Sequence, residues 1–176
     1  LPLDKTVLTN ENVVFRWSEV SGADHYQLQC SPDSSFTAGT LTIDNISETV
    51  YSLLLEDGYW FWRVRAKKEN GEASPWSETR WFLLDSTPPP APLLITPPHN
   101  SYLRENIVSF LWTSAAGAHN YRLLIDDNSD FSSPIQELLV STNFKTLELP
   151  PGKYFWKVAS RDWVRLENWS ETFTFV

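Results

Sequence analysis

An internal repeat constrains this chain more than any other feature of its sequence. One set of residues recurs 95 positions later with its spacing unchanged: Phe15, Trp17, Gly22, Tyr26, Leu28 and Phe36 return as Phe110, Trp112, Gly117, Tyr121, Leu123 and Phe131. Further along, Trp62 returns as Trp156 and Trp76 as Trp169, at offsets of 94 and 93. Loops of unequal length produce such small changes between fixed anchor residues. The repeat therefore predicts two copies of one domain, at 1–85 and 93–176.

Residues 86–92, between the copies, read Ser-Thr-Pro-Pro-Pro-Ala-Pro. Successive prolines fix φ and remove backbone hydrogen-bond donors. The segment is therefore predicted to be a short, extended and semi-rigid linker.

The apolar pattern within each copy has a period of two residues. In the first copy Trp60, Trp62, Val64 and Ala66 alternate with Phe61, Arg63 and Arg65. This alternation is typical of half-buried strands, and no segment has the longer period of an amphipathic helix. Turn signals such as Asn70-Gly71 separate the short strands. The fold class predicted is all-β, with each copy a two-sheet β-sandwich.

The composition narrows the classes of partner. The 14 Lys and Arg against 22 Asp and Glu give a net charge of -8, which would repel phosphate backbones and anionic headgroups. No apolar run approaches the roughly 20 residues of a membrane helix. We therefore expect no nucleic-acid partner and no membrane span. The single Cys excludes an internal disulfide, so stability must come from packed apolar area, including nine Trp, ten Phe and six Tyr.

The repeated residues resemble the fibronectin type III family, an immunoglobulin-like fold. The resemblance rests on a Trp on the second strand, a Tyr-x-Leu on the third, and a Leu-x-x-Gly turn before a Tyr-x-Trp-x-Val strand. In the second copy these are Trp112, Tyr121, Leu123, Leu149, Gly152, Tyr154, Trp156 and Val158. The resemblance implies two tandem fibronectin type III-like domains. It also implies a corner tyrosine, which is Tyr154 in the second copy but is replaced by Trp60 in the first. We expect either the Trp60 indole N–H or the neighbouring Tyr59 to substitute for the missing hydroxyl.

Trp-Ser pairs before each last strand, Trp76-Ser77 and Trp169-Ser170, are similar to those of tandem modules in bacterial and archaeal surface proteins and secreted polysaccharide-degrading enzymes. The resemblance implies a secreted or cell-surface location. It also implies a structural or adhesive role without chemistry.

Catalytic patterns are absent from the sequence. His25, His99 and His119 stand in no nucleophile or metal-ligand spacing. Cys30 shares the inward phase of Tyr26 and Leu28, which predicts a small core residue and not a reactive thiol. We therefore expect no enzyme activity and no cofactor.

One stretch carries a partial calcium-loop pattern, with Asp126, Asn128 and Asp130 at its first, third and fifth positions. The sixth position is Phe131, where such loops need Gly. We interpret the stretch as a turn anchored by Phe131 and keep calcium binding as the alternative.

Aromatic residues that point away from the predicted core are the candidate binding residues. Tyr59, Phe61 and Trp81 alternate out of phase with the core, and outward planar polar groups accompany them at Gln27, Gln29 and Arg63. Such a face suits docking of a protein partner or stacking of a sugar. The opposing interpretation is that arginine stems or the neighbouring copy cover the rings. Trp163 lies in a loop and is a second candidate contact.

The function predicted is a spacer, adhesive or assembly module of an extracellular protein, self-associating or binding a protein partner, within a longer array or fibre. The alternative is an accessory carbohydrate-binding module.

Overall fold

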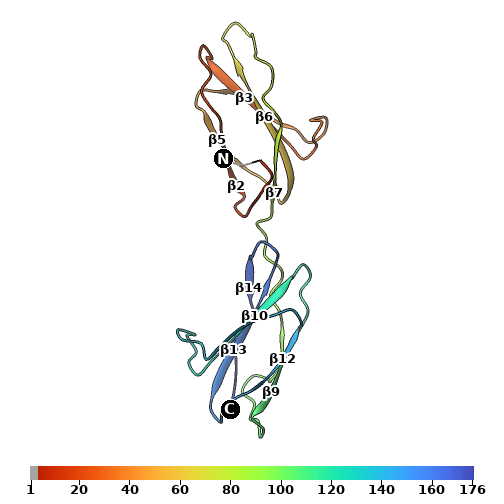
Figure 1. Ribbon diagram of the computed structural model, residues 1–176, viewed down its shortest axis with the longest axis vertical. Coiled ribbons are helices and arrows are strands. Elements are labelled where there is room, and N and C mark those ends of the chain that lie inside the picture. The colour runs from red at the N-terminus through yellow and green to blue at the C-terminus, as the bar shows by residue number, and fades with distance from the viewer. Residues whose placement is uncertain (1–3) are drawn as a thin grey trace. The chain divides into compact units, whose positions relative to one another are not determined.

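A computed structural model describes residues 4–176 and divides the chain into two compact units, Leu1–Thr87 and Pro88–Val176 (Figure 1). The predicted start of the first domain at residue 1 lies outside the described residues. All regular secondary structure within residues 4–176 is β-strand, which confirms the all-β prediction. That part of the chain holds no helix long and apolar enough to cross a membrane.

Unit 1 is a two-layer sandwich. Its strands are β1 (Thr6–Leu8), β2 (Asn12–Arg16), β3 (His25–Ser31), β4 (Leu41–Ile46), β5 (Val50–Leu54), β6 (Gly58–Lys67) and β7 (Arg80–Leu84). One sheet has the order β1-β7-β6-β3-β4, and β2 pairs with β5 to form the other. Strand β1 runs parallel to β7, and all other pairs are antiparallel.

Unit 2 repeats the sandwich with differences at the edges of its sheets. Its strands are β8 (Leu94–Thr96), β9 (Ile107–Trp112), β10 (Asn120–Asp126), β11 (Gln136–Val140), β12 (Phe144–Glu148), β13 (Tyr154–Arg161), β14 (Glu167–Trp169) and β15 (Phe173–Phe175). The larger sheet has the order β11-β10-β13-β14, with β15 also on β13. The smaller sheet has three strands, β12-β9-β8, where unit 1 has two.

The period-two pattern places one aromatic cluster between the sheets of each unit. In unit 1 the ring of Phe15 on β2 meets Trp62 on β6 edge-on, with centroids 5.4 Å apart. In unit 2 Phe110 on β9 meets Trp156 on β13 at 5.1 Å. Offset and edge-on pairs of this kind contribute beyond the area they bury. Both clusters therefore join two sheets that share no backbone hydrogen bonds.

Two repeated aromatic pairs lie outside these cores. Phe36 and Trp76 in unit 1, like Phe131 and Trp169 in unit 2, are only partly buried and do not belong to either core cluster. The repeat alone predicts that all four rings belong to the cores, because the matched positions are aromatic in both copies, and that prediction is wrong. Repetition shows that a position is structurally equivalent in the two copies, but it does not show which face of the sheet the side chain covers.

The corner interaction takes a different chemical form in each unit. The Tyr154 hydroxyl donates to the Pro150 carbonyl at 2.8 Å, four residues earlier. At the equivalent position, the Trp60 indole N–H donates to the Glu56 carbonyl at 2.9 Å, also four residues earlier. The indole thus replaces the missing hydroxyl, which is one of the two alternatives that the sequence leaves open, and Tyr59 points outward.

Both ends of the proline-rich segment 86–92 have partners within a unit. In unit 1 the Ser86 backbone N–H and hydroxyl both donate to Asp57 at 2.7 Å. These bonds hold the pKa of the Asp57 carboxyl below its usual range. In unit 2 Pro89 is buried, and the Ser160 hydroxyl donates to the Pro90 carbonyl at 2.7 Å.

Removal of the Trp112 side chain tests the core. The residue is completely buried, so Trp112→Ala is expected to destabilise unit 2 by about 3–5 kcal/mol, close to the whole stability of a small domain. Calorimetry of the full chain would show the loss of one unfolding transition. The matched control is Trp163→Ala, because Trp163 is 77% exposed. An unchanged transition for Trp112→Ala would contradict the core described above.

The two corners predict a paired effect. Trp60→Phe and Tyr154→Phe each remove one donor while keeping an aromatic ring, and each is expected to lower the free energy of unfolding by about 1 kcal/mol. Chemical denaturation measures both. A loss of stability in only one unit would show that the indole and the hydroxyl do not contribute equally to the free energy of unfolding.

Candidate functional site

Three of the predicted binding residues come together on the outer face of the larger sheet of unit 1. Phe61 on β6 lies directly opposite Trp81 on β7, and the rings of Tyr59 and Trp81 are 5.8 Å apart. Tyr59 is 57% exposed. Val7 and Leu83 continue the same row beside Tyr59, since Val7 pairs with Leu83 and Leu83 with Tyr59. These five residues form the aromatic face.

The predicted planar polar residues lie next to the aromatic face but bond to each other and to neighbouring side chains. Arg63 donates twice to the Gln29 amide oxygen, at 2.9 and 2.8 Å. Arg65 donates to the Gln27 amide oxygen at 2.7 Å, and the Gln27 amide nitrogen donates to Asp44 at 3.0 Å. The side chains of Gln27, Gln29 and Arg63 are thus engaged within unit 1.

The two arginines are also stacked on the partly buried rings of Phe36 and Trp76. The Arg63 guanidinium lies 4.0 Å from the Phe36 ring centroid and 4.6 Å from that of Trp76. The Arg65 guanidinium lies 4.4 Å from the Trp76 ring centroid. Cation–π contacts of this kind contribute about 0.5–1 kcal/mol each at exposed sites. The arginines therefore cover Phe36 and Trp76.

Serine hydroxyls fix the position of Trp76. Ser74 and Ser77, three residues apart, accept backbone hydrogen bonds from Ala66 and Val64 on β6, both at 3.1 Å. The segment before β7 is thereby held along β6, which brings Trp76 between the two arginines. The Ser-x-Trp-Ser spacing of residues 74–77 is the sequence signal for this arrangement in unit 1.

Unit 2 carries a related arrangement, with Lys157 at the position of Arg63 and Ala159 at the position of Arg65. Ser170 accepts from the Val158 backbone at 3.0 Å. The Lys157 ammonium lies 4.3 Å from Phe131 and 4.8 Å from Trp169. A cation between two rings is therefore a structural feature common to both units.

The second candidate contact, Trp163, stacks on a histidine. Its ring lies 3.4 Å from that of His119, at an interplanar angle of 24°. His99 accepts a backbone hydrogen bond from Thr174 at 3.2 Å, and His25 lies on β3 opposite Lys67.

The calcium-loop stretch is a turn in which most acidic and amide groups have local partners, although the buried Asp126 Oδ2 atom accepts no hydrogen bond. Asp126 ends β10 and is fully buried, and its carboxylate accepts from the Asp127 backbone. The Asn128 amide donates to Asp127, and Asp130 accepts from the Ser132 backbone, which lowers the Asp130 pKa. Within residues 4–176 no three His, Cys, Asp or Glu side chains are grouped in a way that could hold a metal ion.

The equivalent turn in unit 1 is closed by Asp33. Its carboxylate accepts hydrogen bonds from the Thr37 and Ser35 hydroxyls and backbones, which hold the pKa of Asp33 far below its usual range. The carboxylate is therefore a turn-closing acceptor. In the folded state the turn would lose these bonds only in strong acid.

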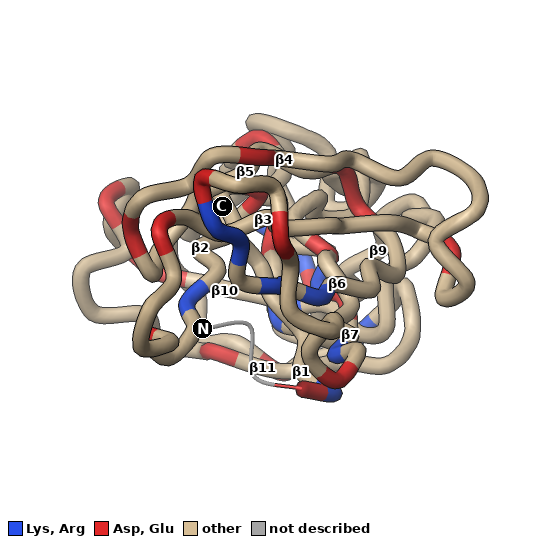
Figure 2. Tube along the Cα trace, turned by 90° about the horizontal axis from the view of Figure 1, so that it is seen from above, with Lys and Arg blue, Asp and Glu red and all other residues tan. Residues whose placement is uncertain are grey.

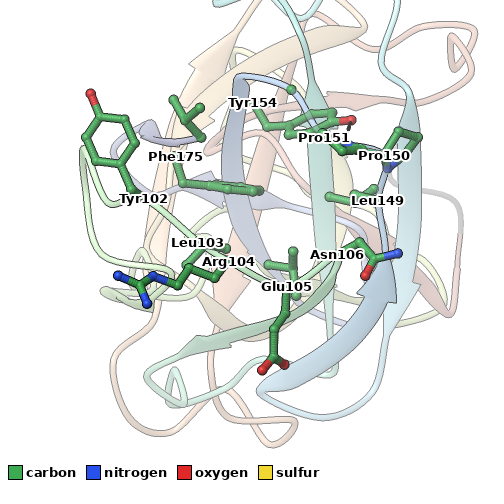
Figure 3. A pocket seen from close by; sticks show the side chains of 13 residues that line it. Tyr102, Leu103, Arg104, Glu105, Asn106, Leu149, Pro150, Pro151, Tyr154 and Phe175 are labelled. Atoms are coloured by element: carbon green, nitrogen blue, oxygen red, sulfur yellow. Dashed lines mark hydrogen bonds between the residues drawn. The ribbon is translucent and has the colours of Figure 1, made fainter.

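A cavity of about 250 Å³ opens at the corner of unit 2 (Figure 3). Leu149, Tyr154 and Phe175 form its apolar interior, while the charged ends of Arg104 and Glu105 extend away from it. The Tyr154 hydroxyl is already bonded to Pro150. The cavity lining therefore presents apolar surface and no paired acid and base.

Figure 2 shows Asp and Glu positions spread over many loops of the chain.

No protein-family model matches the chain. An uncharacterized protein of Treponema pallidum (strain Nichols) is 34% identical over 124 residues, which are 66% of this chain and 17% of that protein. The chain thus spans about a sixth of the length of this relative.

Among solved structures, the chicken CNTN1 FN1–FN3 domains match at a TM-score of 0.53 and 17% identity, over 97% of this chain and 64% of that one. Both units have the fibronectin type III fold. At this identity the likeness establishes the fold and leaves function to the residues of the site. The resemblance seen in the sequence is confirmed at that level.

Two further fibronectin type III structures match at lower scores. A two-domain segment of chicken tenascin has a TM-score of 0.41 at 18% identity, over 94% of this chain and 91% of that one. The fibronectin(III)-like modules of Clostridium thermocellum CbhA have a TM-score of 0.44 at 14% identity, over 99% of this chain and 88% of that one.

The reactivity of the lone cysteine tests whether Cys30 lies in the core of unit 1. Cys30 is fully buried, and burial raises the pKa of its thiol to about 12. The thiolate is the reactive form, so the folded protein is expected to react with a thiol reagent at pH 8 only after denaturant is added. Absorbance at the reagent's chromophore measures this. Ser34→Cys, in an exposed turn, is the control and should react at once; prompt reaction of native Cys30 would contradict its inward placement.

Proposed function

We propose that this tandem fibronectin type III-fold chain is a non-catalytic spacer and protein–protein assembly module of an extracellular or cell-surface protein. The observation that carries the proposal is the aromatic face of unit 1. It exposes apolar rings, beside polar groups that already have partners. An exposed apolar surface with these properties is suited to contact with another apolar surface.

The state of the neighbouring polar groups favours a protein partner over a sugar. Sugar recognition combines ring stacking with hydrogen bonds to hydroxyl groups. Here the Gln29 oxygen is occupied by Arg63, and the Gln27 amide is bonded at both ends by Arg65 and Asp44. The Gln27 and Gln29 oxygens are therefore not free to bind sugar hydroxyls, and the polar groups of the face itself are the Tyr59 hydroxyl and the Trp81 indole N–H.

Two features support the spacer role. Each unit has its own closed aromatic core, so each can act as a rigid element of a longer array. The sandwich architecture is widespread in cell-surface proteins, which supports the extracellular location.

Self-association through the aromatic face is the expected behaviour. Sedimentation equilibrium of the full chain should show concentration-dependent assembly. Tyr59→Asp is expected to weaken it by about tenfold or more, because the substitution places a charge in an apolar contact. The matched control is Leu54→Asp, which changes a 71% exposed residue on the other sheet and should leave assembly unchanged.

Tryptophan fluorescence with a panel of polysaccharides tests the carbohydrate alternative. Saturable quenching that is lost in Trp81→Ala would contradict assembly as the role of the face and support sugar binding. A monomeric chain whose behaviour does not depend on Tyr59 would contradict self-association. Hydrolytic activity of the purified chain would contradict the non-catalytic assignment.

A further inference from the structure

Asp126 carries a buried carboxylate oxygen that has no protein partner. The side chain is completely buried, and its Oδ2 atom accepts no hydrogen bond. The other oxygen, Oδ1, accepts from the Asp127 backbone N–H at 2.8 Å. Asp126 belongs to none of the ion pairs within residues 4–176. Burial of an ionised carboxylate is costly unless the group is paired or coordinates a metal ion, so a bound cation would offset this cost.

The loop between β10 and β11, residues 127–135, covers this carboxylate. Leu123 and Ile125 belong to the core cluster of unit 2, so Asp126 has the opposite phase and lies on the outer side of β10. Its complete burial on that side therefore comes from the loop that follows it. The hydrogen bond from Asp127, the first loop residue, places the carboxylate beneath the loop.

Unit 1 shows what a side chain at this position contacts. The equivalent residue is Ser31, 95 positions earlier, and the loops that follow, 32–40 and 127–135, have equal length. The Ser31 hydroxyl donates to the Ala38 carbonyl and accepts from the Asp33 backbone N–H, both at 3.1 Å. A side chain at this position is therefore directed into the loop, toward a main-chain carbonyl.

The exchange of serine for aspartate changes the chemistry of that contact. The residue equivalent to Ala38 is Ser133 in unit 2. A hydroxyl can donate to the loop carbonyl, but an ionised carboxylate has only acceptor atoms. A carboxylate and a carbonyl that face each other repel. A cation between them reverses the sign of the interaction, because both groups are calcium ligands in proteins.

The other oxygen atoms of the loop differ in whether they are available. The Asn128 amide nitrogen donates to Asp127, which leaves the amide oxygen of Asn128 available as a ligand. Asp130 accepts from a serine backbone N–H two residues further on. Glu137, at the twelfth position of the calcium-loop pattern, is bonded to an arginine on β10. The available ligands are thus one buried carboxylate and neutral oxygens, a set that needs no group of three acidic side chains.

We propose that the β10–β11 loop is a calcium site with Asp126 Oδ2 as its buried ligand. The Asn128 amide oxygen, the Ser133 carbonyl and water complete the coordination. Calcium accepts such mixed oxygen ligands in variable number, whereas magnesium demands near-octahedral geometry. With a single carboxylate, the expected Kd is that of weak extracellular calcium modules, about 0.1–1 mM. The site is separate from the aromatic face, and the inference holds whether or not that face binds a partner.

A titration of the full chain with calcium chloride tests the site. Two-dimensional NMR spectra at constant ionic strength should show saturable shifts of the amide signals of residues 127–135, with half-saturation at about 0.1–1 mM. The signals of residues 32–40 are the internal control, because Ser31 replaces the carboxylate there, and they should not move. Magnesium chloride should produce no saturable shift in this range. Absence of saturable calcium shifts, or equal shifts in both loops, would overturn the site.

Substitutions at Asp126 test its role as the buried ligand. Asp126→Ser gives unit 2 the residue of unit 1, whose hydroxyl can donate to the loop carbonyl, so the fold should persist while the calcium shifts are lost. Asp126→Asn keeps the size and one oxygen but removes the charge, and it should raise the half-saturation by about tenfold or more. The matched control is Glu137→Gln, which should leave the half-saturation unchanged. Calcium shifts retained in Asp126→Ser, or lost in Glu137→Gln, would overturn the proposed ligands.

Discussion

The edge-on contact between one aromatic ring from each sheet is the interaction on which both units depend. Phe15 against Trp62 and Phe110 against Trp156 connect layers that have no hydrogen bonds between them. With no disulfide and fewer than about 90 residues per unit, few other terms could close the sandwich. Further aromatic residues enlarge each core around these pairs, among them Phe82 in unit 1 and Trp112 and Phe175 in unit 2.

The residues on the outer faces of the larger sheets follow from this use of the inward positions. Once the inward phase of β6 is taken by Trp62 and Val64, Arg63 and Arg65 must point outward. Long cationic side chains on a sheet next to aromatic rings gain most by lying over those rings, since their stems stay apolar while the charge remains near water. The cation between two rings in each unit is thus a consequence of strand phase together with the Trp-Ser pair, whose serine hydroxyl accepts from the neighbouring long strand in both units.

The sequence was sufficient for whatever depends on phase and repetition. It predicted the all-β sandwich, the inward position of Cys30 and the grouping of Tyr59 with Trp81, and it left Trp60 as one of two candidate donors at the corner. It was insufficient where a side chain has two stable environments. Trp76 could fill a core or stack between arginines, and both leave it partly shielded from water. Only the geometry of the serine hydrogen bonds to β6 separates the two, because a repeat carries no information about the face of the sheet.

Internal duplication makes each unit a control for the other. Residues that match in type yet differ in burial mark places where the surroundings differ, since the local sequence is the same. Trp17 and Trp112 are such a pair, and the difference arises from a strand that lies beside β9 and from none described beside β2. Large apolar side chains at a sheet edge promote aggregation when they are exposed, so their burial matters for the behaviour of each unit. Trp17 is only partly buried where Trp112 is fully buried, so the same residue type contributes less buried apolar area to unit 1 than to unit 2.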